Sequence, residues 1–428
     1  MKSKWRISLT AAVVAVGLLA PVTVSAANAA PVEIPLWTHN GGNKAELADV
    51  NLVVKDFNAS QSKYKVTVKA FPQINYNDAI VASAAANRLP CILDTDAPVV
   101  PSWVYAGYLS PLTVDKKITD KLQTSVKGSY GGKLYSAGFY DAAIALLARK
   151  STIKEAGLRT PTVAKPWTLA EFNDALAKAK ASGKFDYALS LGTGWDGEWY
   201  PYGFSPLLQS FGGDLINRKT LKTAEGSLNG AAAVAWGKWF QNIFTSGLAP
   251  KKETADQRDN GFVTGKIAYQ WNGSWAAATA AEKLGDDFIA LPPPNLGTKA
   301  YIGGGSWQWA VSSTCANKAG ANAWLQFALQ TKYLAKFADD LFNLPITEEA
   351  TKASKTFGPS SKYADFAKFS ATFALIRPAT PAYPVIAKVF ETATKDIING
   401  ADVQKSLDSA VDQIDKNLKD NYYYVKKK

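Results

Sequence analysis

Apolar and polar residues alternate in blocks along the chain, and their period changes repeatedly between that of a strand and that of a helix. Residues 34–37, Ile-Pro-Leu-Trp, form a short apolar run, and residues 64–69, Tyr-Lys-Val-Thr-Val-Lys, alternate as a strand does. The segment between them has apolar residues at helical spacing: Leu47, Val50, Val54 and Phe57. A strand, a helix and a second strand in this order predict a parallel crossover.

A third predicted strand, at 91–94, follows an Ala-rich helix at 80–87 and runs into polar Thr95 and Asp96. Ligands of open α/β sheets bind beyond the carboxyl ends of the strands. We therefore expect a single crevice to be lined by the segments that follow Trp37, Phe71 and Leu93.

The rest of the chain continues this mixed pattern. An extended segment at 130–141 leads into the apolar residues 143–148. Thr168 and Glu171 have the spacing of a capping box, which starts a helix by satisfying its first backbone N–H groups. Further helices are predicted at 228–243, at 319–329 and, from the apolar stripe 407, 411, 414 and 418, near the C-terminus.

The first 29 residues have the pattern of a secretory signal peptide. Lys2, Lys4 and Arg6 precede an uncharged apolar stretch, and small residues follow it, with cleavage expected after Ala26 or Ala29. No Cys lies nearby to carry a lipid, so we expect an exported, unanchored protein and a periplasmic location. Removing this segment takes three positive charges from a formal net charge of +12.

The remaining basic charge is spread along the chain, and its only dense run is Lys-Lys-Lys at 426–428, so we expect no nucleic-acid partner. About 400 residues exceed what one hydrophobic core supports, and at least two lobes are expected. Cys91 and Cys315 are the only cysteines; in an oxidising compartment they either pair or stay as two buried thiols.

Tryptophan is the residue type that points to a ligand. The chain has 13 Trp and one His, and many of the Trp lie in Gly-rich or polar segments rather than in apolar helices. Flat aromatic faces next to amides and carboxylates suit a sugar, whose C–H faces are apolar and whose rim is hydroxylated. The indoles in such segments are Trp37, Trp195, Trp199, Trp271, Trp275, Trp307 and Trp309.

Several short motifs, in this order, resemble those of the extracellular solute-binding proteins of bacterial sugar ABC importers, the group that contains the maltodextrin-binding protein. They lie at 37–39, 89–94, 106–112, 131–141, 155–158, 166–172, 262–275, 291–294, 303–313, 342–345, 377–383 and 397–400. Each motif alone is weak, but their order behind a signal peptide is specific to this family. The likeness covers nearly all of the mature chain.

The resemblance implies an α/β fold of the type II periplasmic-binding-protein kind, with two lobes joined by three crossovers. It places residues 30–139 and 307–346 in an N-terminal lobe and residues 140–306 and 347–428 in a C-terminal lobe, after the signal peptide at 1–29. The crossovers are expected near 138–141, 304–307 and 345–350. In this family the returning strand lies beside the third strand, which implies a Cys91–Cys315 disulfide away from the crevice.

The resemblance and the residue chemistry together select candidate ligand-binding residues. Trp275, with Gly273, matches the Asn-Gly-x-Trp motif whose Trp stacks on a sugar in the maltodextrin-binding relative. Each of the other candidates has a structural alternative: a helix cap, a hinge, a surface loop or an internal ion pair. These candidates are Trp37, His39, Asn40, Asp94, Asp96, Tyr140, Asp141, Trp195, Trp199, Gly304, Trp307 and Arg377.

The predicted function is that of a receptor that closes on a carbohydrate and delivers it to membrane permease subunits, as a monomer without cofactor or metal. His39 and Arg377 keep an alternative open, an anionic sugar derivative or a glycerol phosphate as ligand. A secreted glycan-active enzyme is a weaker alternative, with Asp196 and Glu198, or Asp94 and Asp96, as its carboxylate pair. No Gly-x-Ser-x-Gly, His-Glu-x-x-His or phosphate-loop motif supports an enzyme.

Overall fold

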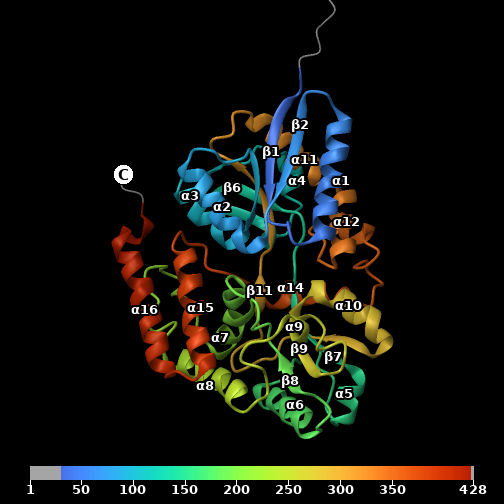
Figure 1. The fold of residues 1–428 in the computed structure, drawn as a ribbon, viewed down its shortest axis with the longest axis vertical. Helices are drawn as coiled ribbons and strands as arrows, with labels where there is room; N and C mark the ends of the chain where they lie inside the picture. The colour runs from blue at the N-terminus through green and yellow to red at the C-terminus, as the bar shows by residue number, and fades with distance from the viewer. Residues whose placement is uncertain (1–29, 426–428) are drawn as a thin grey trace, which may run out of the picture.

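The computed structural model describes residues 30–425, so the predicted signal peptide lies outside the described residues. The chain forms two α/β lobes, which lie one above the other in Figure 1. The upper lobe, here the first lobe, is built on a seven-stranded sheet, and the lower, second lobe on a four-stranded sheet. Within the described part of the chain, no helix has the length and apolarity required to cross a membrane.

The sheet of the first lobe confirms the predicted parallel crossover. Its strand order is β2–β1–β3–β12–β6–β5, with β4 paired to β12. Strand β1 runs parallel to β2 and β3, whereas β12 is antiparallel to both β3 and β6. The strands are β1 (Val32–Thr38), β2 (Tyr64–Ala70), β3 (Ile92–Asp96), β4 (Leu109–Ser110), β5 (Lys127–Tyr130), β6 (Lys133–Gly138) and β12 (Trp307–Ser312).

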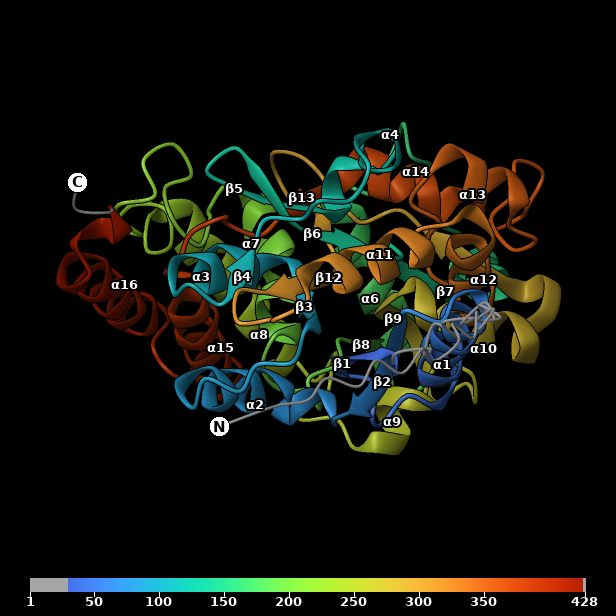
Figure 2. The same ribbon diagram turned by 90° about the horizontal axis from the view of Figure 1, so that it is seen from above.

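Helices cover both faces of this sheet because successive strand residues point to opposite faces. In β3, Ile92 belongs to a core with helices α1, α11 and α12, whereas Leu93 belongs to a core with α2 and α3. Figure 2 shows α1 and α12 on one side of the sheet and α2 and α3 on the other. Their bounds are α1 (Lys44–Ser60), α2 (Gln73–Ala85), α3 (Val100–Tyr105), α11 (Lys318–Ala328) and α12 (Thr331–Leu341).

A disulfide joins Cys91, just before β3, to Cys315, just after β12. The two strands are antiparallel neighbours, and Val311 pairs with Ile92 next to the bond. The disulfide therefore lies at the opposite end of β3 from Asp96, within the first lobe.

The second lobe has the strand order β10–β7–β9–β8 around one large core that contains Trp167, Trp236 and Tyr269. Its strands are β7 (Ile144–Arg149), β8 (Tyr187–Ser190), β9 (Ile267–Gly273) and β10 (Phe288–Leu291). The helices that pack around them include α6 (Leu169–Ala181), α8 (Ala231–Thr245), α10 (Ser274–Leu284), α14 (Ala364–Phe373), α15 (Tyr383–Asn399) and α16 (Val403–Asp420).

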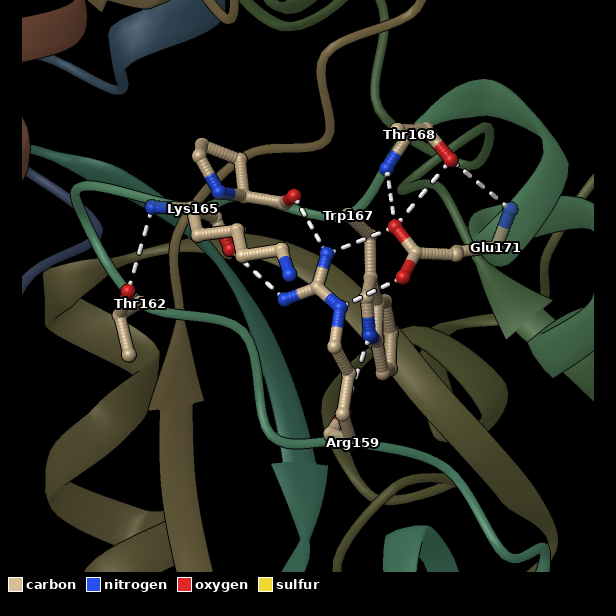
Figure 3. Close-up of polar contacts among 7 residues, drawn as sticks. Arg159, Thr162, Lys165, Trp167, Thr168 and Glu171 are labelled. Atoms are coloured by element: carbon tan, nitrogen blue, oxygen red, sulfur yellow. Dashed lines mark hydrogen bonds and ion pairs between the residues drawn. The ribbon is translucent and has the colours of Figure 1, made fainter.

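The predicted capping box at the start of α6 is confirmed. The Thr168 hydroxyl accepts a hydrogen bond from the Glu171 backbone N–H at 3.3 Å, and the Glu171 carboxylate accepts one from the Thr168 N–H at 2.9 Å. Figure 3 shows that Arg159 also binds this carboxylate, with two nitrogens at 2.5 and 2.6 Å. These bonds lower the pKa of Glu171 to about 2 and fix the loop before α6.

Three stretches of chain connect the lobes. The first lies between β6 and β7, the second between β11 (Ile302–Gly304) and β12, and the third follows α12. The first and third are hydrogen-bonded to each other, because Asp141 and Leu344 exchange backbone bonds of 2.9 and 2.7 Å. The second lobe also holds β11 in a parallel pair with β13 (Ala374–Ile376).

Candidate functional site

Polar residues gather where β1 and β3 of the first lobe end. Thr38 ends β1 and His39 follows it, while Asp94 and Asp96 lie at the end of β3. Trp307 begins β12 directly opposite Asp96 in the antiparallel register. The strand order therefore brings together groups that are separated by more than 200 positions in the sequence.

His39 is held by the Asp94 carboxylate. Oxygen Oδ2 of Asp94 lies 2.7 Å from His39 Nδ1 and accepts hydrogen bonds from the His39 N–H at 3.2 Å and the Thr38 hydroxyl at 2.6 Å. The second ring nitrogen, Nε2, lies 3.7 Å from the Glu46 carboxylate. Burial lowers the pKa of His39, but the charges of Asp94 and Glu46 outweigh it and the pKa is raised above its usual value.

The carboxylate of Glu46, on α1, is itself buried. Tyr140 donates its hydroxyl to Glu46 at 2.9 Å. Burial raises the pKa of Glu46, while His39, Tyr140 and Asn40 act in the opposite direction. Tyr140 and Asn40, both predicted as ligand contacts, thus lie in a buried polar cluster behind His39.

Trp307 stacks on the His39 ring. The two ring centroids are 3.6 Å apart and the planes differ by 7°. Tyr76 packs edge-on against the same indole, with centroids 6.0 Å apart. Trp307 is half-buried, so one face of its indole is covered by imidazole while part of the ring stays accessible.

Trp37, near the end of β1, belongs to the same aromatic cluster as Tyr76 and Trp307. It packs against Phe71, with ring centroids 4.8 Å apart, and the Lys69 ammonium lies 4.8 Å from its ring. Its indole is half-buried. The segments after β1 and β2 therefore meet in an aromatic pair, as the strand pattern predicts.

The second lobe contributes a cluster of Trp195, Trp199, Tyr202 and Trp275, here called the indole cluster. Trp199 lies at its centre, with ring centroids 4.6 Å from Trp195, 6.2 Å from Tyr202 and 6.3 Å from Trp275. Its Nε1 donates to the Leu191 carbonyl at 2.9 Å, which fixes the ring. Trp199 is buried, whereas Trp195 and Trp275 remain half-exposed.

Glycines make room for these rings. A Cβ on Gly273 would lie 2.1 Å from the Trp275 ring, so this indole can fold back over the backbone only because residue 273 has no side chain. Gly192 has a φ of +71°, and a Cβ there would lie 2.8 Å from both Trp195 and Trp199. Gly273 therefore contributes to the site by positioning Trp275.

Arg377 joins the two lobes. It follows β13 and donates Nη1 and Nη2 to the two oxygens of Asp96, at 3.1 and 3.2 Å. Its Nη1 also donates to Glu198, which accepts a further hydrogen bond from the Tyr383 hydroxyl. The guanidinium carbon lies 4.9 Å from the centre of the Tyr202 ring, which connects this network to the indole cluster.

Burial and neighbouring charges shift the pKa values of the groups in this network to different extents. Burial lowers the pKa of Arg377, but the neighbouring carboxylates of Asp96 and Glu198 raise it further, so the guanidinium stays charged. Burial raises the pKa of Glu198 to about 7, because desolvation and the charge of Asp96 outweigh the attraction of Arg377. Arg377 is therefore balanced by carboxylates of the protein itself.

Two other predicted residues have internal partners. Asp141 is fully buried and accepts hydrogen bonds from Ser125 of the first lobe at 2.9 Å and Ser370 of the second lobe at 3.1 Å. Gly304 lies in β11, where a Cβ would come within 3.3 Å of the β13 backbone. Both residues belong to the connections between the lobes.

The predicted residues thus fall into groups in the structure. Trp37, Asp96 and Trp307 lie at the strand ends of the first lobe, and Trp195, Trp199 and Trp275 lie in the indole cluster. The predicted ligand contacts do not include Tyr202 and Tyr383, nor Glu198, which is predicted as a carboxylate of the enzyme alternative. Glu198 stands between two predicted Trp in Trp-Asp-Gly-Glu-Trp, a signal that was available, whereas nothing in the sequence links Tyr383 to Arg377.

Comparison with protein families gives a match to the model described as bacterial extracellular solute-binding protein, over residues 53–368. This range includes most of the first lobe and both sheets apart from β1. No curated protein sequence matches the chain.

Solved structures with the same fold are numerous. The GacH receptor of Streptomyces glaucescens, studied with acarbose, is 21% identical with a TM-score of 0.75, over 91% of this chain and 98% of the receptor. The maltose/maltodextrin-binding domain from Bdellovibrio bacteriovorus, bound to maltotriose, is 17% identical with a TM-score of 0.75, over 91% and 100%. An ABC substrate-binding protein from Listeria monocytogenes, in complex with cycloalternan, is 18% identical with a TM-score of 0.74, over 91% and 99%.

Proposed function

Because the chain belongs to the family of bacterial extracellular solute-binding proteins, we propose that it binds a carbohydrate between its lobes and delivers it to the permease of an ABC importer. The observation that carries the proposal is the arrangement of half-exposed indoles in both lobes around the Asp96–Arg377–Glu198 network. Indole faces suit the apolar faces of a sugar ring, and carboxylates suit its hydroxyls. Three proteins of the same fold were solved with acarbose, maltotriose and cycloalternan, which are also carbohydrates.

We assign direct ligand contact to the accessible groups of the two clusters. These are Trp37, Trp195, Glu198, Trp275 and Trp307. The other predicted residues have the role of holding these groups in place, because they are buried among protein atoms. They are His39, Asn40, Asp94, Asp96, Tyr140, Asp141, Trp199, Gly273, Gly304 and Arg377.

A neutral sugar is favoured over an anionic one. Arg377 would be the natural group to bind a phosphate or carboxylate bidentately. In the structure its two terminal nitrogens already bind Asp96, and Nη1 also binds Glu198. An anionic ligand would have to compete with two carboxylates that carry the same charge.

We propose binding without catalysis. In each carboxylate pair that an enzyme would use, at least one carboxylate is bound to a different protein group, so the two are not arranged as a catalytic pair. Asp196 pairs with Lys395 at 2.6 Å while Glu198 binds Arg377, and Asp94 is fully buried against His39. Retention of the ligand in unchanged form is therefore expected.

The family is extracellular, and we propose a periplasmic, unlipidated and monomeric protein with the lobe boundaries given above. The proposal of an unlipidated protein depends on residues 1–29, which contain no Cys.

The experiment is a thermal-shift panel of neutral oligosaccharides, uronates and phosphorylated polyols with the mature protein. Ligand that binds the folded state raises the melting temperature by mass action. Trp275→Ala should abolish the shift that a neutral oligosaccharide gives, and Trp239→Ala, which removes a half-buried indole on α8, should keep it. Stabilisation only by anionic ligands, or conversion of the sugar to products, would contradict the proposal.

A further inference from the structure

The stacked pair His39 and Trp307 has a feature that the sugar-receptor proposal does not explain. Both nitrogens of the imidazole face carboxylates, Asp94 at 2.7 Å and Glu46 at 3.7 Å. The side chain is 4% exposed. No nitrogen of His39 is left for a ligand, although the residue lies at the end of β1, where ligands of this fold class bind.

The surrounding bonds fix the ring in one orientation. The Asp94 oxygen that binds Nδ1 also accepts the backbone N–H of His39 and the hydroxyl of Thr38, so it cannot turn away without losing three contacts. Glu46 is fixed in turn by the Tyr140 hydroxyl at 2.9 Å. A neutral imidazole donates only one hydrogen, whereas the doubly protonated ring serves both carboxylates.

The fixed His39 ring packs against one face of the Trp307 indole. With ring centroids 3.6 Å apart and planes that differ by 7°, the imidazole covers part of one indole face and keeps a ligand from that part. Tyr76 packs edge-on against the same indole, and Trp307 as a whole is half-buried, so part of its ring stays accessible. A positively charged ring against an indole face is also an attractive cation–π contact.

We propose that His39 is a positioning residue: its imidazolium, held by Asp94 and Glu46, stacks under Trp307 and presents the opposite indole face as the first-lobe wall of the sugar site. The inference rests on the proposed function, since it takes Trp307 as a wall for the ligand. It assigns to the single His of the chain a role that requires its charge as well as its shape.

The groups that face His39 determine its protonation. Asp94 and Asp96 lie on β3, Glu46 on α1, and the uncharged hydroxyls of Tyr76 and Tyr140 on α2 and the first crossover. The net effect of these neighbours raises the pKa of His39. The imidazolium therefore persists to a higher pH than that of an ordinary His and is lost as the pH rises through the raised pKa.

The first test needs no ligand. A protonated imidazole in contact with an indole quenches its fluorescence, so emission of the wild-type protein should rise in a step on the alkaline side of pH 6.5, the ordinary pKa of His. Trp307→Phe should remove this step. Asp94→Asn, which takes away one carboxylate charge, should move it to lower pH. A step that persists in Trp307→Phe, or no step in the wild type, would overturn the inference.

The second test uses maltotriose as the probe in calorimetric titrations. Trp307→Phe and His39→Gln should each weaken binding by about tenfold, and the double variant should weaken it no further, because both changes remove the same wall. Additive losses would overturn the positioning role. If wild-type protein binds no sugar of the panel, the proposed function fails, and the fluorescence step alone then decides whether His39 and Trp307 are coupled.

Discussion

Arg377 of the second lobe donates its two terminal nitrogens to the two oxygens of Asp96 in the first lobe, at 3.1 and 3.2 Å. The residues are 281 positions apart and both are buried. This bidentate pair is a direct polar connection between the lobes next to the indole cluster. Its strength should affect both the stability of the protein and the ease with which the lobes separate.

Arg377→Met is expected to lower the free energy of unfolding by about 3 kcal/mol or more, because it leaves the buried Asp96 without its positive partner. Urea denaturation at neutral pH measures the change. Lys116→Met, which breaks the exposed pair with Asp120, should change stability by about 0–1 kcal/mol and serves as the control. Equal effects of the two substitutions would contradict the burial argument.

Glu198 should make stability depend on pH. Its pKa is raised to about 7 in the folded protein from a usual 4.5, so the folded state binds a proton that the unfolded state has lost. The contribution of Glu198 to stability is therefore full below about pH 4.5 and declines as the pH rises toward 7. Glu46 and Asp141 have raised pKa values that act in the same direction.

Glu198→Gln removes the pH-dependent contribution of Glu198 to stability and keeps those of Glu46 and Asp141. Urea denaturation between pH 5 and 8 should give a smaller loss of stability with rising pH in the variant than in the wild type. The slopes of the two curves should differ only in the interval between about pH 4.5 and 7. Parallel curves would show that Glu198 titrates normally in the folded protein.

Gly273→Ala should weaken sugar binding through Trp275. The new Cβ would lie 2.1 Å from the present position of the indole, which must therefore move. We expect at least a tenfold loss in affinity, measured by titration calorimetry, together with folded-state circular dichroism close to that of the wild type. Gly42→Ala meets no atom within 4 Å and should bind as the wild type does. Unchanged affinity of Gly273→Ala would remove Trp275 from the site.

Replacing both cysteines by serine should lower the free energy of unfolding by about 2–5 kcal/mol, since the disulfide closes a loop of 224 positions in the unfolded chain. Sugar affinity should not change, because the bond lies at the far end of β3 from Asp96. Urea denaturation and calorimetry of the double variant measure the two effects. A fall in affinity would mean that the disulfide influences the strand ends after all.

The fold could be predicted from local patterns because these record which face of each element is buried. The strand predicted at 64–69 is β2 (Tyr64–Ala70), and the capping box at Thr168 starts α6 as expected. Helices predicted at 228–243 and 319–329 run from Ala231 to Thr245 and from Lys318 to Ala328. The small shifts arise at helix ends, where apolar spacing gives little information.

The partners of the site residues could not be predicted in the same way. Arg377 suits an anionic ligand or an internal ion pair equally well in the sequence, and only the fold brings it to Asp96 and Glu198. His39 similarly gives no sign that both of its nitrogens meet carboxylates on β3 and α1. Such contacts depend on the register of distant strands, which a local pattern does not contain.

The backbone bonds between Asp141 and Leu344 constrain how the molecule can open. Two connecting segments joined by this pair of backbone hydrogen bonds cannot slide past each other without breaking them, so we expect the lobes to rotate about an axis close to the Asp141–Leu344 bridge. The lobes would then open and close around every sugar by the same rotation. Substitutions in the aromatic walls could alter the choice of sugar while the mechanics of opening stay the same.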